Sequence, residues 1–245
     1  MEERGIVYIV RGKNFVKEAL LSVHSLRKFC PDIPVTIFSD IEFQSDLVQN
    51  VVLIDKGQIR PKVDCIMDTP YKEAIFLDSD TIIDHDITEM FRILDKYEFA
   101  IAHDLGRKRK KISKLLPEYK AVPYEFPECN TGVFVFKNND RVQNLFKRWN
   151  EIFYKYYDKF QWDQASFRCA LWEVDLNLYI LPPEYNIRSK MNREKQDRFH
   201  HEFGEEHLKP RIYHMHVDNR INQGTYEVKS VDEALKYCVK HHMPY

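Results

Sequence analysis

The stretch Ala74-Ile75-Phe76-Leu77-Asp78-Ser79-Asp80-Thr81 joins a continuous apolar run to two carboxylates that stand two residues apart. A short apolar run of this kind is typical of a strand that is buried on both faces. If the backbone stays extended through Ser79, the side chains of Asp78 and Asp80 point to the same face. Two carboxylates on one face repel each other unless a cation lies between them, and oxygen ligands suit Mg²⁺ or Mn²⁺. The stretch therefore predicts half of a metal site. The alternative is that both aspartates only cap the turn after the strand.

Apolar, β-branched runs alternate with amphipathic stretches on both sides of this segment. Strands are expected at residues 5–10, 34–38, 51–54, 131–136, 178–181 and 211–216. Helices are expected over 14–29, about 140–157, from about 163, and over 231–239. The core face of the first helix would consist of Phe15, Ala19, Leu20, Val23, Leu26 and Phe29. This alternation predicts an α/β fold with a mainly parallel central sheet flanked by helices, in which ligands bind beyond the carboxyl ends of the strands.

The composition indicates an ordinary globular protein. Hydrophobic residues make up 44% and charged residues 31% of the 245, and we expect a single domain over 1–245 because no composition break divides the chain. The five cysteines form no C-x-x-C pair, which favours a reducing compartment over a zinc motif or a disulfide framework. No apolar run is long enough for a transmembrane segment, so we expect a soluble, cytoplasmic protein.

A basic run at 107–114 contrasts with the net charge of −1. It lies in a stretch, 104–128, that has three prolines and no clean period, and that is expected to be a long surface excursion. The run either helps to close over an anionic ligand or is a solvated loop. Because it has no interleaved aromatic residues, nucleic acid is not an expected partner.

Two histidines near the carboxyl end fit the same metal site. In Ile212-Tyr213-His214-Met215-His216, strand alternation places His214 and His216 on one face. Mn²⁺ accepts a nitrogen ligand beside oxygens, so either imidazole could complete the shell. The alternative is that both are partly buried strand residues with hydrogen bonds to their neighbours.

Several segments in order along the chain carry a family resemblance. Besides the Asp-x-Asp motif and Tyr213-His214, they are Lys62-Val63-Asp64-Cys65, Asn130-Thr131-Gly132-Val133-Phe134-Val135-Phe136 and Trp162-Asp163-Gln164. Together they resemble the retaining glycosyltransferases of the glycogenin and galactosyltransferase type, glycosyltransferase family 8, which have the nucleotide-binding GT-A fold. The sequence departs from the family pattern at two places. The family's Lys-Pro-Trp segment is missing after His214, and Phe167 and Arg168 stand where the family often has a leucine and an asparagine.

The resemblance implies roles for individual residues. It assigns the metal, Mn²⁺ or Mg²⁺, to Asp78, Asp80 and His214, with His216 as the alternative nitrogen ligand. Donor-binding residues would be Lys62, Asp78, Ser79, Asn130, Thr131 and Gly132, with Arg220 in place of the missing lysine. Asp163 and Gln164 would lie near the anomeric carbon as catalytic residues. Four of these residues have ordinary structural alternatives: a solvated lysine for Lys62, a turn for Asn130, close packing for Gly132 and a helix N-cap for Asp163.

The expected function is therefore a metal-dependent glycosyltransferase. It would move a hexosyl or pentosyl group from a nucleotide-diphosphate sugar, a UDP-sugar before a GDP- or dTDP-sugar, to a glycan or other hydroxyl acceptor, with retention. If Asp163 instead lies behind the anomeric carbon, it could deprotonate the acceptor and the reaction would invert. One alternative is a sugar-nucleotide pyrophosphorylase, which the single Gly12 after the first strand disfavours. Another is a non-catalytic anion-binding module built on the basic run. An aromatic-rich stretch at 154–162 is explained by helical packing.

Overall fold

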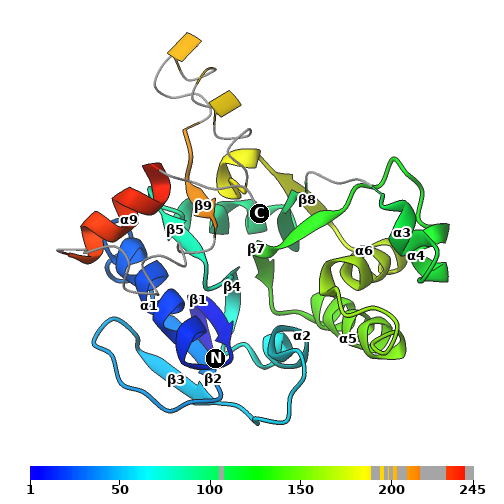
Figure 1. The fold of residues 1–245 in the computed structure, drawn as a ribbon, viewed down its shortest axis with the longest axis horizontal. Coiled ribbons are helices and arrows are strands. Elements are labelled where there is room, and N and C mark those ends of the chain that lie inside the picture. Colours follow the sequence, from blue (N-terminus) through cyan, green and yellow to red (C-terminus); the bar gives the residue numbers. More distant parts are fainter. Residues whose placement is uncertain are drawn as a thin grey trace.

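The structure, a computed structural model, describes residues 1–104, 108–188, 194–195, 198, 201–202, 209–215 and 230–240. Its centre is a seven-stranded sheet with the order β3-β2-β1-β4-β7-β6-β8 (Figure 1). The strands are β1 (Glu2–Val10), β2 (Val35–Ser39), β3 (Asn50–Leu53), β4 (Tyr71–Leu77), β6 (Phe99–His103), β7 (Cys129–Lys137) and β8 (Leu178–Leu181). Only β7 runs antiparallel to its neighbours in this sheet of described strands, so the prediction of a mainly parallel α/β sheet is confirmed.

Helices cover both faces of the sheet. The longer ones are α1 (Lys13–Arg27), α5 (Asp140–Lys155), α6 (Asp163–Glu173) and α9 (Val231–Lys240). The shorter ones are α2 (Pro61–Cys65), α3 (Lys110–Ser113), α4 (Pro117–Ala121) and the 3₁₀ helices η1 (Ile66–Asp68), η2 (Thr88–Asp95) and η3 (Pro183–Tyr185). In Figure 1, α5 and α6 lie to one side of the sheet and α1 to the other.

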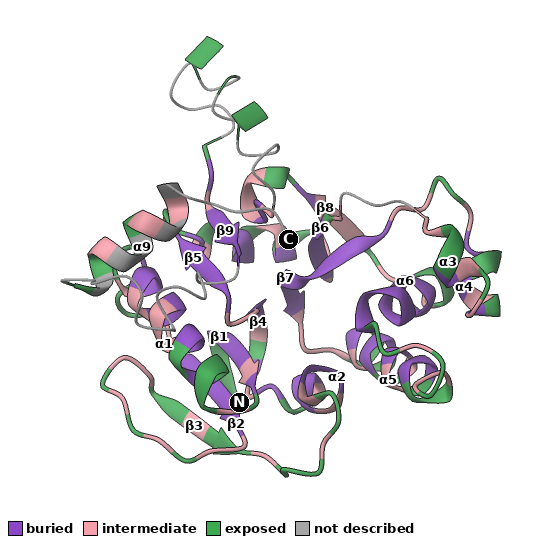
Figure 2. Ribbon diagram, viewed as in Figure 1, coloured by how far each residue is buried: buried purple, intermediate pink, exposed green. Residues whose placement is uncertain are grey.

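Strand alternation distributes the apolar side chains between two cores. In β4, Phe76 packs into the core formed with α5 and α6, whereas Ile75 and Leu77 pack into the core formed with α1 and η2. Figure 2 shows the central strands and the inner sides of these helices as buried. Because both faces of β4 and β7 are covered over 74–77 and 133–136, these segments are apolar throughout instead of alternating with polar residues.

A second, two-stranded sheet lies beyond the end of β4. It pairs β5 (Thr81–Ile83) with β9 (Ile212–His214) in antiparallel fashion, with Thr81 opposite His214. The sequence predicted a strand over 211–216, and β9 covers its first half, while His216 lies outside the described residues. Neither β5 nor β6 was predicted, because a run of three to five residues does not by itself distinguish a strand from other buried structure.

Other expectations need correction. Phe15 and Phe29, expected in the core, are 49% and 38% exposed, because α1 ends at Arg27 and Phe15 turns away from the sheet. The excursion at 104–128 contains two short helices, α3 and α4. The four cysteines whose side chains are described are buried free thiols, as expected of a chain without a disulfide framework. Among the described residues, no helix has the length and apolar character needed to cross a membrane.

Candidate metal and sugar-nucleotide site

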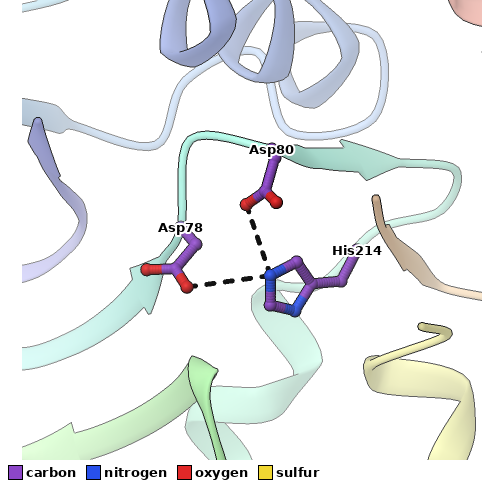
Figure 3. A group of neighbouring side chains, drawn as sticks. All are labelled: Asp78, Asp80 and His214. Carbon is purple, nitrogen blue, oxygen red and sulfur yellow. Dashed lines mark ion pairs between the residues drawn. The ribbon is translucent and has the colours of Figure 1, made fainter. Parts of the chain in front are cut away.

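Asp78, Asp80 and His214 converge beyond the end of β4 (Figure 3). The His214 Nε2 atom lies 3.3 Å from Asp80 Oδ1 and 3.7 Å from Asp78 Oδ2, and the three potential ligand atoms lie within 4.8 Å of one another. Asp80 and His214 are buried, and Asp78 is partly exposed. The backbone does not stay extended through Ser79, because the chain turns at Ser79 and Asp80. The turn, rather than strand alternation, brings the two carboxylates toward the imidazole.

Buried hydroxyl groups hold this turn. Thr81 Oγ1 donates to the Asp78 carbonyl oxygen at 2.9 Å. Thr81 Oγ1 also shares a 2.7 Å hydrogen bond with Ser22 of α1, and the Ser22 hydroxyl bonds Tyr8 of β1 in turn. On the other side, the Asp78 backbone N–H donates to the Gly132 carbonyl oxygen at 2.8 Å. The turn is therefore fixed by groups from β1, α1 and β7, far apart in sequence.

A chain of amides orients the His214 ring. Asn130 Oδ1 accepts from the Gly132 backbone N–H and from Asn186 Nδ2, which leaves Asn186 Oδ1 to accept from His214 Nδ1 at 2.9 Å. Held by this hydrogen bond through Nδ1, the ring points its Nε2 atom at the two carboxylates, the orientation that a metal ligand needs. Asn186 was not predicted from the sequence, because nothing in the stretch Glu184–Arg188 marks it as part of a site.

Gly132 makes room for this ring. A Cβ atom at this position would lie 2.0 Å from His214 Cε1 and 2.7 Å from Asp78 Oδ2, closer than nonbonded atoms approach. Gly132 does not line the cavity described below, where the resemblance had implied a role in donor binding. Gly132 is therefore a close-packing glycine, as the structural alternative suggested, and the side chains that need the space are two of the three potential metal ligands.

The three side chains fit a divalent cation. The two carboxylates repel each other, and a cation between them removes that repulsion, while the imidazole can add a nitrogen ligand. The mixed oxygen and nitrogen set suits Mn²⁺ and also allows Mg²⁺. The cluster could therefore hold such a metal ion, although its geometry does not identify the ion.

Lys62 and Asp163 form a buried ion-pair group beside the cluster. Lys62 Nζ lies 2.9 Å from Asp78 Oδ1 and 3.6 Å from Asp163 Oδ2, with only 9% of its side chain exposed, so the alternative of a solvated lysine was wrong. Arg60 donates to Asp163 Oδ2 through Nε and Nη2 at 3.0 and 2.8 Å. Burial by itself raises the pKa of Asp163, but Lys62 and Arg60 outweigh it and hold this pKa below its usual range. The N-cap of α6 is Trp162, so the alternative of an N-cap for Asp163 was also wrong.

Glu18 is a further acidic residue near the cluster that sequence reasoning missed. It is 6% exposed and accepts a hydrogen bond from Ser79 Oγ at 3.3 Å. Burial and the nearby Asp80 raise the pKa of Glu18 to about 7, which the Ser79 hydrogen bond partly opposes. The signal was present in the sequence, because Glu18, Ser22 and Ser25 form a polar stripe at helical spacing. All three are buried, with Glu18 and Ser22 bonded to Ser79 and Thr81 and Ser25 bonded to the backbone N–H of Ile83 in β5.

A cavity of about 370 Å³ is lined by both the metal cluster and the ion-pair group of Lys62 and Asp163. Its lining includes nine of the twelve predicted site residues: Lys62, Asp78, Ser79, Asp80, Asn130, Thr131, Asp163, Gln164 and His214. It also includes residues that the prediction did not place in a site, among them Arg11, Phe15, Arg60, Trp162 and Arg188. The predicted Arg220 and His216 lie outside the described residues, as does Arg107 of the basic run.

Phe167 and Arg168, which stand where the family often has a leucine and an asparagine, lie away from the cavity. Phe167 packs in the core against Trp149, with the rings in edge contact. Arg168 is 1% exposed and donates to the carbonyl oxygens of Pro123 and Phe126. These residues therefore tie α6 to the excursion at 104–128 and do not line the cavity.

Comparisons with known proteins agree with this geometry. The family model of nucleotide-diphospho-sugar transferases matches residues 72–225, more than half of the chain. The chain therefore belongs to the nucleotide-diphospho-sugar transferase family and is a glycosyltransferase of the GT-A type. A search of curated protein sequences finds no match.

Solved structures show the same fold. A galactosyltransferase, LgtC, in complex with donor and acceptor sugar analogs superposes with a TM-score of 0.60 at 11% identity, covering 95% of each chain. The glycosyltransferase GlyE of Streptococcus pneumoniae TIGR4 gives 0.61 at 14% identity, covering all of this chain and 65% of its own. Mouse xyloside xylosyltransferase 1 gives 0.55 at 13% identity, covering 86% of this chain and 97% of its own.

Proposed function

We propose that this protein transfers a sugar from a nucleotide-diphosphate sugar, with a UDP-sugar as the expected donor, to a hydroxyl group of a glycan acceptor, and that the reaction depends on Mn²⁺ or Mg²⁺. The observation that carries this proposal is the convergence of Asp78, Asp80 and His214 at one end of a cavity that also contains Lys62 and Asp163. The family supports the nucleotide-sugar donor.

Asp78, Asp80 and His214 would hold the metal. When bound, such an ion neutralises charge on the leaving diphosphate as a Lewis acid. The chain contributes the arrangement around it, since Asn186 orients His214 and the hydroxyls of Ser22 and Thr81 hold the turn. A site held this rigidly needs little rearrangement when charge develops on the leaving group.

Other cavity residues would bind the donor. The ammonium group of Lys62 has a fixed position beside Asp78 and near Thr131, where it can add positive charge next to the diphosphate. Asn130 and Gln164 are joined by a 3.1 Å hydrogen bond, and their amides would face the transferred sugar. Ser79 also lines the cavity.

The environment of Asp163 favours retention. A general base for an inverting reaction needs a carboxylate that readily takes a proton, but Lys62 and Arg60 lower the pKa of Asp163 and stabilise its charged form. Asp163 would therefore act on the donor by charge and position rather than by removing a proton from the acceptor. Retention requires no strong base from the protein.

The test is donor hydrolysis by the purified protein with a panel of nucleotide sugars, in MnCl₂ or in EDTA. We expect slow, metal-dependent hydrolysis of one donor, lost in Asp80→Asn and retained in the matched control Asp84→Asn, whose carboxylate is outside the cluster. Metal binding, measured as the rise in melting temperature on adding MnCl₂, should follow the same pattern. Hydrolysis that is equal in EDTA, or that survives in Asp80→Asn, contradicts the metal assignment. An inverted product contradicts retention.

A further inference from the structure

Trp162 differs from the other aromatic residues of its stretch. Its side chain lines the cavity directly before Asp163 and Gln164, and the residue is 42% exposed. Tyr154, by contrast, donates to Asp64 on the far side of α2 and does not line the cavity. Helical packing, the expected explanation for the whole stretch, therefore does not explain Trp162.

A fixed cation braces the indole ring. The guanidinium of Arg109 lies 3.9 Å from the centroid of the Trp162 ring. It is paired with Asp104 and Glu128 at 3.2 Å each, and the side chains of these two acids are only 5% and 1% exposed. The backbone N–H of Arg109 also donates to the Tyr119 hydroxyl. Buried partners thus restrain the cation, and the cation restrains the ring, so a ligand that stacks on this indole meets a surface that loses little conformational entropy.

Trp162 lies on a different side of the metal cluster from the residues that follow β1. Arg11 and Phe15, which follow β1, line the cavity where nucleotides commonly meet open α/β sheets, at the first turn between a strand and a helix. Trp162 immediately precedes α6, which packs against α5 and β7, and the strand that ends at Asp78 lies between β1 and β7. The indole is therefore on the side of the metal cluster away from β1, where the acceptor would approach.

A second observation points to a hydroxyl-bearing ligand at the same place. Gln164 is 4% exposed, and its Nε2 atom is buried in the structure without a hydrogen-bond partner. A buried donor of this kind is costly unless a ligand supplies an acceptor. The transferred sugar can supply this acceptor oxygen, so Trp162 would lie beside the sugar that is being transferred, where a second sugar ring can offer its apolar C–H face to the indole.

We propose that Trp162, braced by Arg109, is the acceptor platform of this enzyme, and that the acceptor is a saccharide whose ring stacks on the indole. The inference rests on the proposed function, because it assigns the acceptor end of the same cavity. It adds to the proposed glycan acceptor the residue that would bind it and the requirement that the acceptor sugar has an exposed apolar face.

The experiment measures transfer to a panel of p-nitrophenyl hexosides and pentosides together with hydrolysis of the donor. The variants are Trp162→Ala and Trp162→Phe, with Trp172→Ala as the matched control. Trp172 lies in α6, the helix that begins directly after Trp162, and is 49% exposed, but it packs against Phe126 and does not line the cavity. In Trp162→Ala we expect the acceptor KM to rise at least tenfold more than the donor KM, because stacking is lost. The acceptor KM of Trp162→Phe should lie between those of Trp162→Ala and the wild type. The acceptor KM of Trp172→Ala should equal that of the wild type.

Three results overturn the inference. One is an acceptor KM in Trp162→Ala that equals that of the wild type or rises only together with the donor KM. Another is a wild-type enzyme that hydrolyses its donor but transfers to no glycoside of the panel, which leaves the proposed function standing. The third is the absence of metal-dependent donor hydrolysis in the wild type, which removes the proposed function as well. If Trp162→Ala does not fold, as judged by thermal unfolding, the graded effect in Trp162→Phe decides.

Discussion

At the scale of single residues, the site depends on the absence of a side chain at Gly132 as well as on the side chains of its potential metal ligands. Gly132 gives His214 the space in which its ring faces Asp78 and Asp80. The Asp-x-Asp pair was predicted from two carboxylates that follow an apolar strand, and the family resemblance pointed to His214, with His216 as the alternative ligand. Asn186 and Arg60 could not be predicted, because an asparagine or an arginine gains its role only from the partner that folding brings to it.

Gly132→Ala should weaken metal binding. The added Cβ would displace His214 or Asp78, and misplacing a metal ligand typically costs ten- to a hundredfold in affinity. The affinity for Mn²⁺ can be measured by electron paramagnetic resonance of the free ion. Gly57→Ala, in an exposed loop where the nearest atom to the new Cβ is Asp55 Oδ1 at 3.3 Å, is the control. Equal affinity in Gly132→Ala and the wild type would show that the ring does not need this space.

At the scale of elements, α6 connects the cavity to the excursion at 104–128. Its first residues, Asp163 and Gln164, line the cavity, and Arg168, one turn later, holds the backbone of the excursion. The Arg168 guanidinium also lies 4.7 Å from the ring centroid of Tyr119 in α4. Burial lowers the pKa of Arg168, yet the carbonyl groups around it satisfy the charged side chain. The excursion is thus packed against the site by a side chain whose sequence position gave no hint of this role.

Arg168→Met should destabilise the protein by about 3 kcal/mol, because the carbonyl groups of Pro123 and Phe126 lose a charged donor in a buried position. Urea unfolding followed by circular dichroism measures the change. Arg148→Met serves as the matched control, since Arg148 forms partly exposed ion pairs with Glu151 and Glu173, and such pairs contribute up to about 1 kcal/mol. Similar losses in the two variants would contradict a special role for Arg168.

At the scale of the whole molecule, acidic groups gather at one end of the sheet although the net charge is only −1. Glu18, Asp78, Asp80 and Asp163 all lie near the end of β4, and each comes from or follows an element that the fold brings there. Lys62 and Arg60 balance part of this charge. The concentration favours cation binding and costs stability when no cation is bound.

Glu18→Gln should therefore stabilise the protein in EDTA at high pH. The native pKa of Glu18 is raised to about 7 from 4.5, so the unfolded chain loses this proton first as pH rises from 4.5 to 7, and the native state becomes less stable over that window. The variant cannot lose the proton and should be more stable than the wild type at pH 8 by on the order of 2 kcal/mol. Below pH 4.5 the two should be equally stable. Urea unfolding at pH 4 and pH 8 measures this, and a difference that does not change with pH would contradict it.

The sequence by itself determined the α/β class and the buried strand that ends in Asp78-Ser79-Asp80, because hydrophobic periodicity and turn residues act locally. The family resemblance, rather than any local pattern, indicated the other cavity residues that were predicted, such as Lys62, Asn130 and Gln164. Tertiary structure decided the rest. The turn that directs the two carboxylates, the pairing of β5 with β9 that delivers His214 from more than 130 residues away, and the amide chain through Asn186 all depend on contacts between distant segments. Such contacts are set by the packing of the whole chain, which no local pattern in the sequence encodes.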